Sequence, residues 1–198
     1  MPVQTQSYTI PAKSRSLIVC AGTVTCRNVS EMGSGFTVFK TYFNQHKHVN
    51  GKGTWEDALN GLLAKFHRIE QEMPSYVRLA EQDGYIGGVG TVPVRGAKGL
   101  TFKEFSNDKE REQAFIGQYK KAVRDAIADA KELQRPLYIQ PLGIGVYGWD
   151  PELAATLFAE TIRDADPNNE VDITIPIFGE NSKRFEAALH QALKTSAS

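Results

Sequence analysis

The chain has few cysteines for its size. Among 198 residues only Cys20 and Cys26 carry thiols. Two cysteines so close together form no disulfide framework, and this spacing alone is not a metal site. We therefore expect a reducing compartment such as the cytoplasm, and we expect no bound metal.

Excess charge of one sign and long apolar runs are also missing. Lys and Arg number 23, equal to Asp and Glu at 23. A balanced charge argues against a large nucleic-acid surface, which needs basic excess. No apolar run is long enough to cross a membrane, and residues 1–16 have no apolar core of a secretory signal. We expect a monomer with no cofactor that binds neither membranes nor nucleic acid.

The chain does have enough apolar residues for a core. Its hydrophobic fraction is 41%, and 198 residues suit one domain. We expect a single domain over 1–198. Residues 1–15 would form an N-terminal arm or edge strand, and 195–198 would fray.

Apolar patterns predict an α/β fold. Residues 16–24 are β-branched and apolar, which is typical of a strand buried on both faces. Residues 36–43 fit a strand or a helix start equally well. Residues 84–99 are glycine-rich with a short β-like core, which suggests a strand end and a mobile loop. The other expected elements are helices 54–73 and 110–133, strand 137–142, helix 151–164, strand 171–177 and helix 182–194. The alternation of strands and helices predicts one three-layer domain around a largely parallel sheet.

A glycine-rich loop stands between strand 137–142 and helix 151–164. Gly143, Gly145 and Gly148 fall within six residues, and Asp150 followed by proline is a favoured helix start. Ligands of open α/β sheets bind at the carboxyl ends of strands, and a helix N-terminus favours anions. The loop therefore predicts a phosphate site, with Tyr147 and Trp149 as an aromatic wall for a sugar or base. The alternative is a tight turn that binds nothing.

Residues 136–195 resemble the C-terminal part of macrodomains, which bind ADP-ribose. In that family a strand ends in a Gly-x-Gly-[Val/Ile]-[Tyr/Phe]-Gly-[Tyr/Phe] loop, followed by a helix, a strand, a phenylalanine near the ligand and a closing helix. The resemblance implies a three-layer α/β/α sandwich with a mixed, largely parallel sheet. The ligand residues that it implies here are Gly143, Ile144, Gly145, Val146, Tyr147, Gly148, Trp149 and Phe178.

The first half of the chain implies further ligand residues. Cys20 and Ala21 stand where the family has an asparagine-rich strand end, and Gly33, Ser34 and Gly35 stand where it has a second glycine loop. The family asparagines have no counterpart, which favours binding over hydrolysis. If the chain hydrolyses an ADP-ribosyl bond, Glu31 beside the second loop is the candidate that positions the attacking water.

Rival motifs give weaker signals. Residues 50–54 (NGKGT) lack the upstream glycine and the Mg²⁺-binding hydroxyl of a P-loop, and HKH at 46–48 has no supporting metal ligands nearby. Cys20 could be a nucleophile or a small buried residue. Three functions stay open: a module binding free or protein-linked ADP-ribose or a related NAD-derived nucleotide, an ADP-ribosyl hydrolase, and an interaction protein that has lost the pocket.

Overall fold

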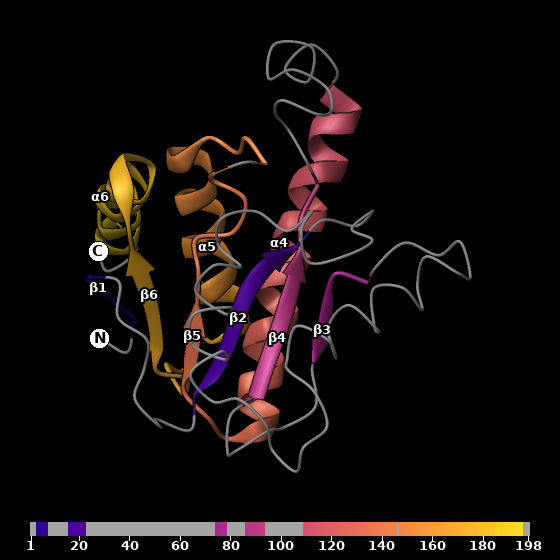
Figure 1. Ribbon diagram of the computed structural model, residues 1–198, viewed down its shortest axis with the longest axis vertical. Helices are drawn as coiled ribbons and strands as arrows, with labels where there is room; N and C mark the ends of the chain where they lie inside the picture. The colour runs from indigo at the N-terminus through magenta and orange to yellow at the C-terminus, as the bar shows by residue number, and fades with distance from the viewer. Residues whose placement is uncertain are drawn as a thin grey trace, which may run out of the picture.

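The structure is a computed structural model that describes residues 3–7, 16–22, 74–78, 86–93, 109–145 and 147–195. These residues form six strands and three helices (Figure 1). The strands are β1 (Val3–Ser7), β2 (Leu17–Gly22), β3 (Tyr76–Arg78), β4 (Ile86–Thr91), β5 (Leu137–Ile139) and β6 (Ile173–Ile177). The helices are α4 (Lys109–Leu133), α5 (Pro151–Ala165) and α6 (Gly179–Thr195).

The strands form one mixed sheet in the order β1-β6-β5-β2-β4-β3. All neighbours are parallel except β3, which pairs antiparallel with β4 at one edge. β2 lies in the middle, and its six residues LIVCAG are almost entirely buried, as expected of a parallel strand covered on both faces. The mixed, largely parallel sheet confirms the predicted fold class.

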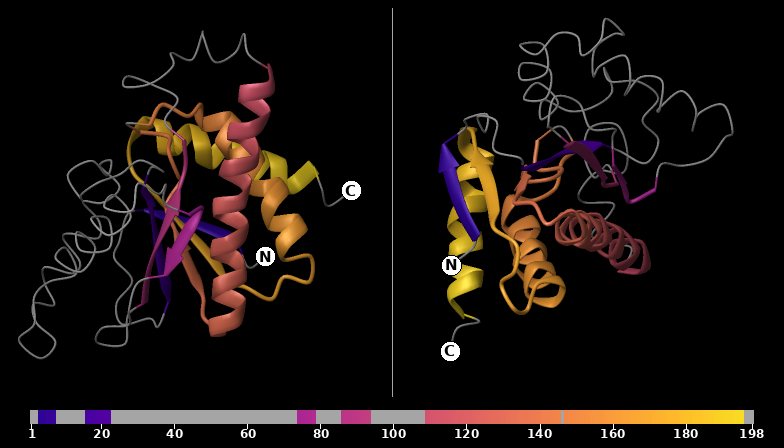
Figure 2. Two further views of the ribbon diagram at one scale, coloured as in Figure 1. Left: turned by 90° about the vertical axis from the view of Figure 1, so that its right-hand side faces the viewer. Right: turned by 90° about the horizontal axis from the view of Figure 1, so that it is seen from below.

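The three described helices lie side by side on one face of the sheet (Figure 2). α5 packs between α4 and α6, and each helix buries an apolar stripe. The expected helix 54–73 and the uncertain segment 36–43 lie outside the described residues. The structure therefore describes the helical layer on one side of the sheet only.

A row of aromatic rings joins this helical layer to the glycine loop. Tyr119 of α4 lies 4.5 Å from Trp149 and 6.0 Å from Phe158 of α5, measured between ring centroids. Phe158 in turn meets Phe185 of α6 edge to face at 5.2 Å. Such pairs each stabilise by about 0.5–1.5 kcal/mol beyond the area they bury. The loop is thus attached to fully buried aromatic residues of the core.

Most expected elements are present, with shifted ends. The strand expected over 137–142 ends at Ile139, although the Gln140 amide still donates to the Val19 carbonyl at 3.1 Å. The closing helix begins three residues before the predicted start, at Gly179. Near the N-terminus, β1 pairs with β6 and lies at one edge of the sheet.

The short β-like core expected within residues 84–99 is present as β4, residues 86–91. It is a complete, fully buried inner strand and not only the end of one. Its glycines allow close approach: a Cβ on Gly88 would lie 2.5 Å from the Tyr76 hydroxyl, and one on Gly90 would lie 3.1 Å from the Leu142 side chain. Residues 94–99 lie outside the described part.

Candidate functional site

The glycine loop lies at the point where the sheet's connections diverge. From β2 the sheet continues through β4 on one side, and from β5 it continues through β6 on the other. The carboxyl ends of these four parallel strands share one edge of the sheet, and the crevice outside such a switch point is where open α/β sheets bind ligands. Residues 142–149 follow β5 at this position.

Two glycines give the loop its shape. Gly143 has φ +73° and Gly148 has φ +75°, a region that side chains rarely adopt. Within the turn, the Gly148 amide donates to the Gly145 carbonyl at 3.1 Å, and the Trp149 amide donates to the Gly143 carbonyl at 2.9 Å. The loop is therefore a compact turn closed by its own backbone.

The inner side of the loop is fixed to the core. The indole N–H of Trp149 donates to the Pro93 carbonyl at 2.7 Å, beyond the end of β4. The Tyr119 hydroxyl donates to the Leu142 carbonyl at 2.6 Å. Because both bonds are buried, where unpaired polar groups are costly, they hold the loop in one position against the strand ends.

The outer side of the loop faces solvent. Gly145 is exposed and Gly148 is half-buried, whereas Gly143 and Ile144 are buried. Within the described part of the chain, the Gly145 amide has no hydrogen-bond acceptor. The backbone amide of an exposed residue on a fixed turn can donate to an anionic ligand.

The N-terminus of α5 is occupied by the protein's own carboxylate. Asp150 adopts an extended conformation, and its Oδ2 accepts from the Leu153 amide at 3.0 Å. This confirms the predicted N-cap. It also uses one of the amides expected to attract phosphate, so an anion at this site depends more on the loop amides than on the helix end.

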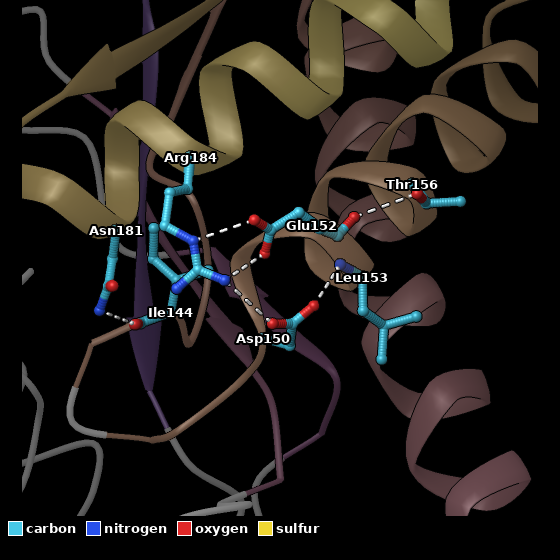
Figure 3. A network of polar contacts seen from close by, with 7 residues as sticks. All are labelled: Ile144, Asp150, Glu152, Leu153, Thr156, Asn181 and Arg184. Carbon is cyan, nitrogen blue, oxygen red and sulfur yellow. Dashed lines mark hydrogen bonds and ion pairs between the residues drawn. The ribbon is translucent and has the colours of Figure 1, made fainter.

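Arg184 of α6 balances the acidic start of α5 (Figure 3). Its guanidinium donates to Glu152 through Nε at 2.9 Å and through a terminal nitrogen at 2.6 Å, and it lies 3.5 Å from Asp150. This guanidinium lowers the pKa of Glu152 and the carboxylate raises the pKa of Arg184. Both groups therefore stay charged at neutral pH, and the arginine offsets negative charge close to the loop.

The structure separates the predicted ligand residues by exposure. Tyr147 and Trp149 are buried, the latter with 1% of its surface exposed, so the proposed aromatic wall packs inward in this structure. Phe178 is 78% exposed and follows β6, whose carboxyl end lies at the same edge as the loop. Cys20 is fully buried inside β2, and Ala21 beside it is half-buried.

Several predicted residues cannot be placed. Glu31, Gly33, Ser34, Gly35 and Val146 lie outside the described residues, as do Cys26 and the HKH and NGKGT segments. In the ranges that the structure describes, no group of three His, Cys, Asp or Glu residues could hold a metal ion. Among the three described helices, none combines the length and the apolar character that a membrane span requires.

Sequence reasoning missed two residues next to the loop, Asn181 and Arg184. Both lie on the first two turns of α6, and the Asn181 side-chain amide donates to the Ile144 carbonyl at 3.0 Å (Figure 3). No motif marks them, because their role depends on where α6 packs. The available signal was Gly179, which has φ +81° and begins α6. A helix predicted to start there would have placed both residues in its first two turns.

Comparison with known proteins supports the fold through structural similarity, whereas sequence comparison finds nothing. No family model matches the chain, and no curated protein matches it. Several solved structures match its fold. A mutant of the Oceanobacillus iheyensis macrodomain matches with a TM-score of 0.65 at 13% identity, covering 98% of this chain and 93% of that one.

Two further similar structures are complexes with nucleotide ligands. The same bacterial macrodomain with ADP has a TM-score of 0.58 at 12% identity, covering 93% of this chain and 90% of that chain. Poly(ADP-ribose) glycohydrolase from Deinococcus radiodurans, in complex with ADP-ribose, has a TM-score of 0.58 at 13% identity, covering 99% and 85%. The chain therefore has the macrodomain fold. Its sequence is highly divergent from these neighbours.

Proposed function

We propose that the protein binds ADP-ribose, or a related NAD-derived nucleotide, as a sensor or binding module. The observation that carries this proposal is the fixed glycine turn at the switch point of a macrodomain fold, with the exposed Gly145 amide on its outer side. Structural neighbours described with ADP and with ADP-ribose support the choice of ligand class.

The loop suits a diphosphate for a physical reason. Phosphate oxygens accept strong hydrogen bonds from backbone amides, and glycine lets them approach without meeting a Cβ. Phe178 presents an exposed ring at the same edge, where it can pack against the base or the distal ribose. In this proposal Tyr147 and Trp149 shape the loop from within, and any ligand contact they make is through the backbone.

Titration calorimetry with ADP-ribose tests the proposal, using Gly145→Val as the disruptive variant. A valine side chain at the exposed tip covers the amide and keeps phosphate at a distance, so we expect affinity to fall at least about tenfold. Unchanged affinity would place the diphosphate elsewhere, and absence of binding by the wild type would reject the function.

A matched control is available on α4. Gly117 is exposed, and a Cβ there would meet nothing within 4 Å. Gly117→Val makes the same chemical change on the exposed face of α4, where the side chain meets nothing, so it should leave ADP-ribose affinity unchanged. Equal losses in both variants would indicate a general effect of valine on the fold.

Hydrolysis of an ADP-ribosyl bond is the alternative function. It needs a water held against the anomeric carbon, and Glu31 is the residue proposed to orient it. Incubating the wild type with ADP-ribosylated protein and analysing the products separates a hydrolase from a module that only binds. A product that forms in the wild type and not in Glu31→Gln would assign this role.

A further inference from the structure

The carbonyl of Ile144 is held from outside the loop. The Asn181 side-chain Nδ2 donates to it at 3.0 Å, across 37 residues of sequence (Figure 3). Ile144 itself is buried, so its side chain anchors the residue on the core side while its carbonyl is anchored on the α6 side. Both ends of one loop residue are therefore fixed.

This bond also decides where the next amide points. The Ile144–Gly145 peptide is trans, since the described residues include no cis peptide bond. In a planar trans peptide the carbonyl and the N–H point in opposite directions. With the Ile144 carbonyl turned toward Asn181, the Gly145 N–H must point away from α6. Rotating this peptide unit would break the Asn181 bond.

Asn181 is itself held by a well-fixed helix. Phe185, one turn further along α6, is fully buried against Phe158 of α5. Arg184 ties the same turn of α6 to Glu152 of α5. The asparagine thus reaches the loop from a rigid element, which is what precise positioning of a binding group requires.

We infer that Asn181 is a positioning residue that sets the orientation of the Ile144–Gly145 peptide and so aims the Gly145 amide at an anionic ligand. The inference rests on the proposed binding of an ADP-ribose-type nucleotide at this loop. Asn181 does not touch the ligand. It acts by keeping a glycine-containing peptide, which would otherwise rotate at little cost, in the binding orientation.

The test compares Asn181→Ala with Asn168→Ala in the full chain. Asn168 is an exposed asparagine between α5 and β6, at the opposite end of the sheet. Losing one neutral hydrogen bond that preorganises the site should weaken ADP-ribose binding about three- to tenfold in Asn181→Ala. The Tm should change little, because Asn181 is exposed, and Asn168→Ala should match the wild type.

A second measurement needs no ligand. The amide NMR resonance of Gly145 in the free protein should shift in Asn181→Ala and stay in place in Asn168→Ala. If neither this resonance nor ADP-ribose affinity changes in Asn181→Ala, the inference is overturned. If the wild type fails to bind ADP-ribose, the proposed function fails, and the Gly145 resonance still decides whether Asn181 orients the peptide.

Discussion

At the scale of single residues, Gly143 shows why the loop needs glycine. The residue has φ +73°, and a Cβ there would lie 2.6 Å from Cδ1 of the Trp149 ring. Trp149 cannot move away, because its indole N–H is bonded to the Pro93 carbonyl and its ring packs on Tyr119. Backbone conformation and packing therefore impose the same choice at this position.

We predict that Gly143→Ala destabilises the protein by about 2–4 kcal/mol. The left-handed conformation costs about 1–2 kcal/mol for a residue with a Cβ, and the clash with Trp149 adds an overpacking cost. Urea unfolding of the variant measures the loss. Gly117→Ala is the control: in an exposed helix position alanine should be neutral or stabilise by up to about 1 kcal/mol. Equal stability of Gly143→Ala and the wild type would contradict this account.

The sequence predicts this loop well but not its supporting residues. Glycine spacing after an apolar strand and Asp150 before a proline are local signals, and the structure confirms the turn and the cap. Trp149 looks like a ligand-facing residue in the sequence, because no neighbouring residue shows that its ring packs against Tyr119 in the core. Asn181 is invisible for the same reason, since its contact depends on the packing of α6.

At the scale of elements, a buried carboxylate attaches the edge strand β3 to α4. Asp129 accepts from the Tyr76 hydroxyl at 2.5 Å and forms an ion pair with Arg78. The Asp129 side chain is only 8% exposed, whereas Arg78 is 40% exposed. One turn earlier, Asp125 accepts from Ser75 and Lys121 at a more exposed position. The three-residue strand thus depends on side-chain bonds as much as on pairing with β4.

We predict that Asp129→Ala costs about 2–4 kcal/mol of unfolding free energy. The change removes the buried acceptor that the half-buried Tyr76 hydroxyl shares with the more exposed Arg78 guanidinium. Asp125→Ala makes the same substitution on the same helix at a more exposed site, where the side chain is 31% exposed, and should cost under about 1 kcal/mol. Urea unfolding of both variants is the measurement, and similar losses would show that burial of Asp129 is not what matters.

Sequence reasoning says least about these short and glycine-rich elements. β3 has three residues, too few for an alternating pattern, and its place is set by Asp129 and by pairing with β4. β4 carries Gly87, Gly88 and Gly90, which locally suggest a loop. Glycine is required at Gly88 and Gly90 because Tyr76 and Leu142 lie against the strand, and both residues are distant in sequence. Long periodic segments such as α4 and α5 can be predicted from their own local pattern.

At the scale of the whole molecule, the amphipathic pattern was sufficient to predict the sheet class. Apolar runs predicted β2 and β6, and helical periodicity predicted α4, α5 and α6. Their alternation indicated that neighbouring strands are parallel. The strand order could not be predicted, since it depends on how the helices and strands pack together in the folded chain. The switch point between β2 and β5, which places the candidate site, is therefore a property of the folded chain and not of any one motif.

Stability at high pH depends on two tyrosines that join different parts of the molecule. Burial raises the pKa of Tyr119, which bonds the loop carbonyl of Leu142. Burial, and then the hydrogen bond to Asp129, raise the pKa of Tyr76. In the unfolded chain both hydroxyls ionise near pH 10. Their stabilising contribution is therefore complete below about pH 10 and is lost as the pH rises above it.

We predict that the wild type loses stability faster than Tyr119→Phe above about pH 10. Each such tyrosine steepens the loss by up to about 1.4 kcal/mol per pH unit, because the unfolded chain releases a proton that the folded chain keeps. Near pH 8, Tyr119→Phe should be about 1 kcal/mol less stable, since the Leu142 carbonyl loses its donor. The two unfolding free energies should then converge near pH 11. Urea unfolding between pH 8 and pH 11 gives both curves, and parallel curves would show that ionisation of Tyr119 does not oppose folding.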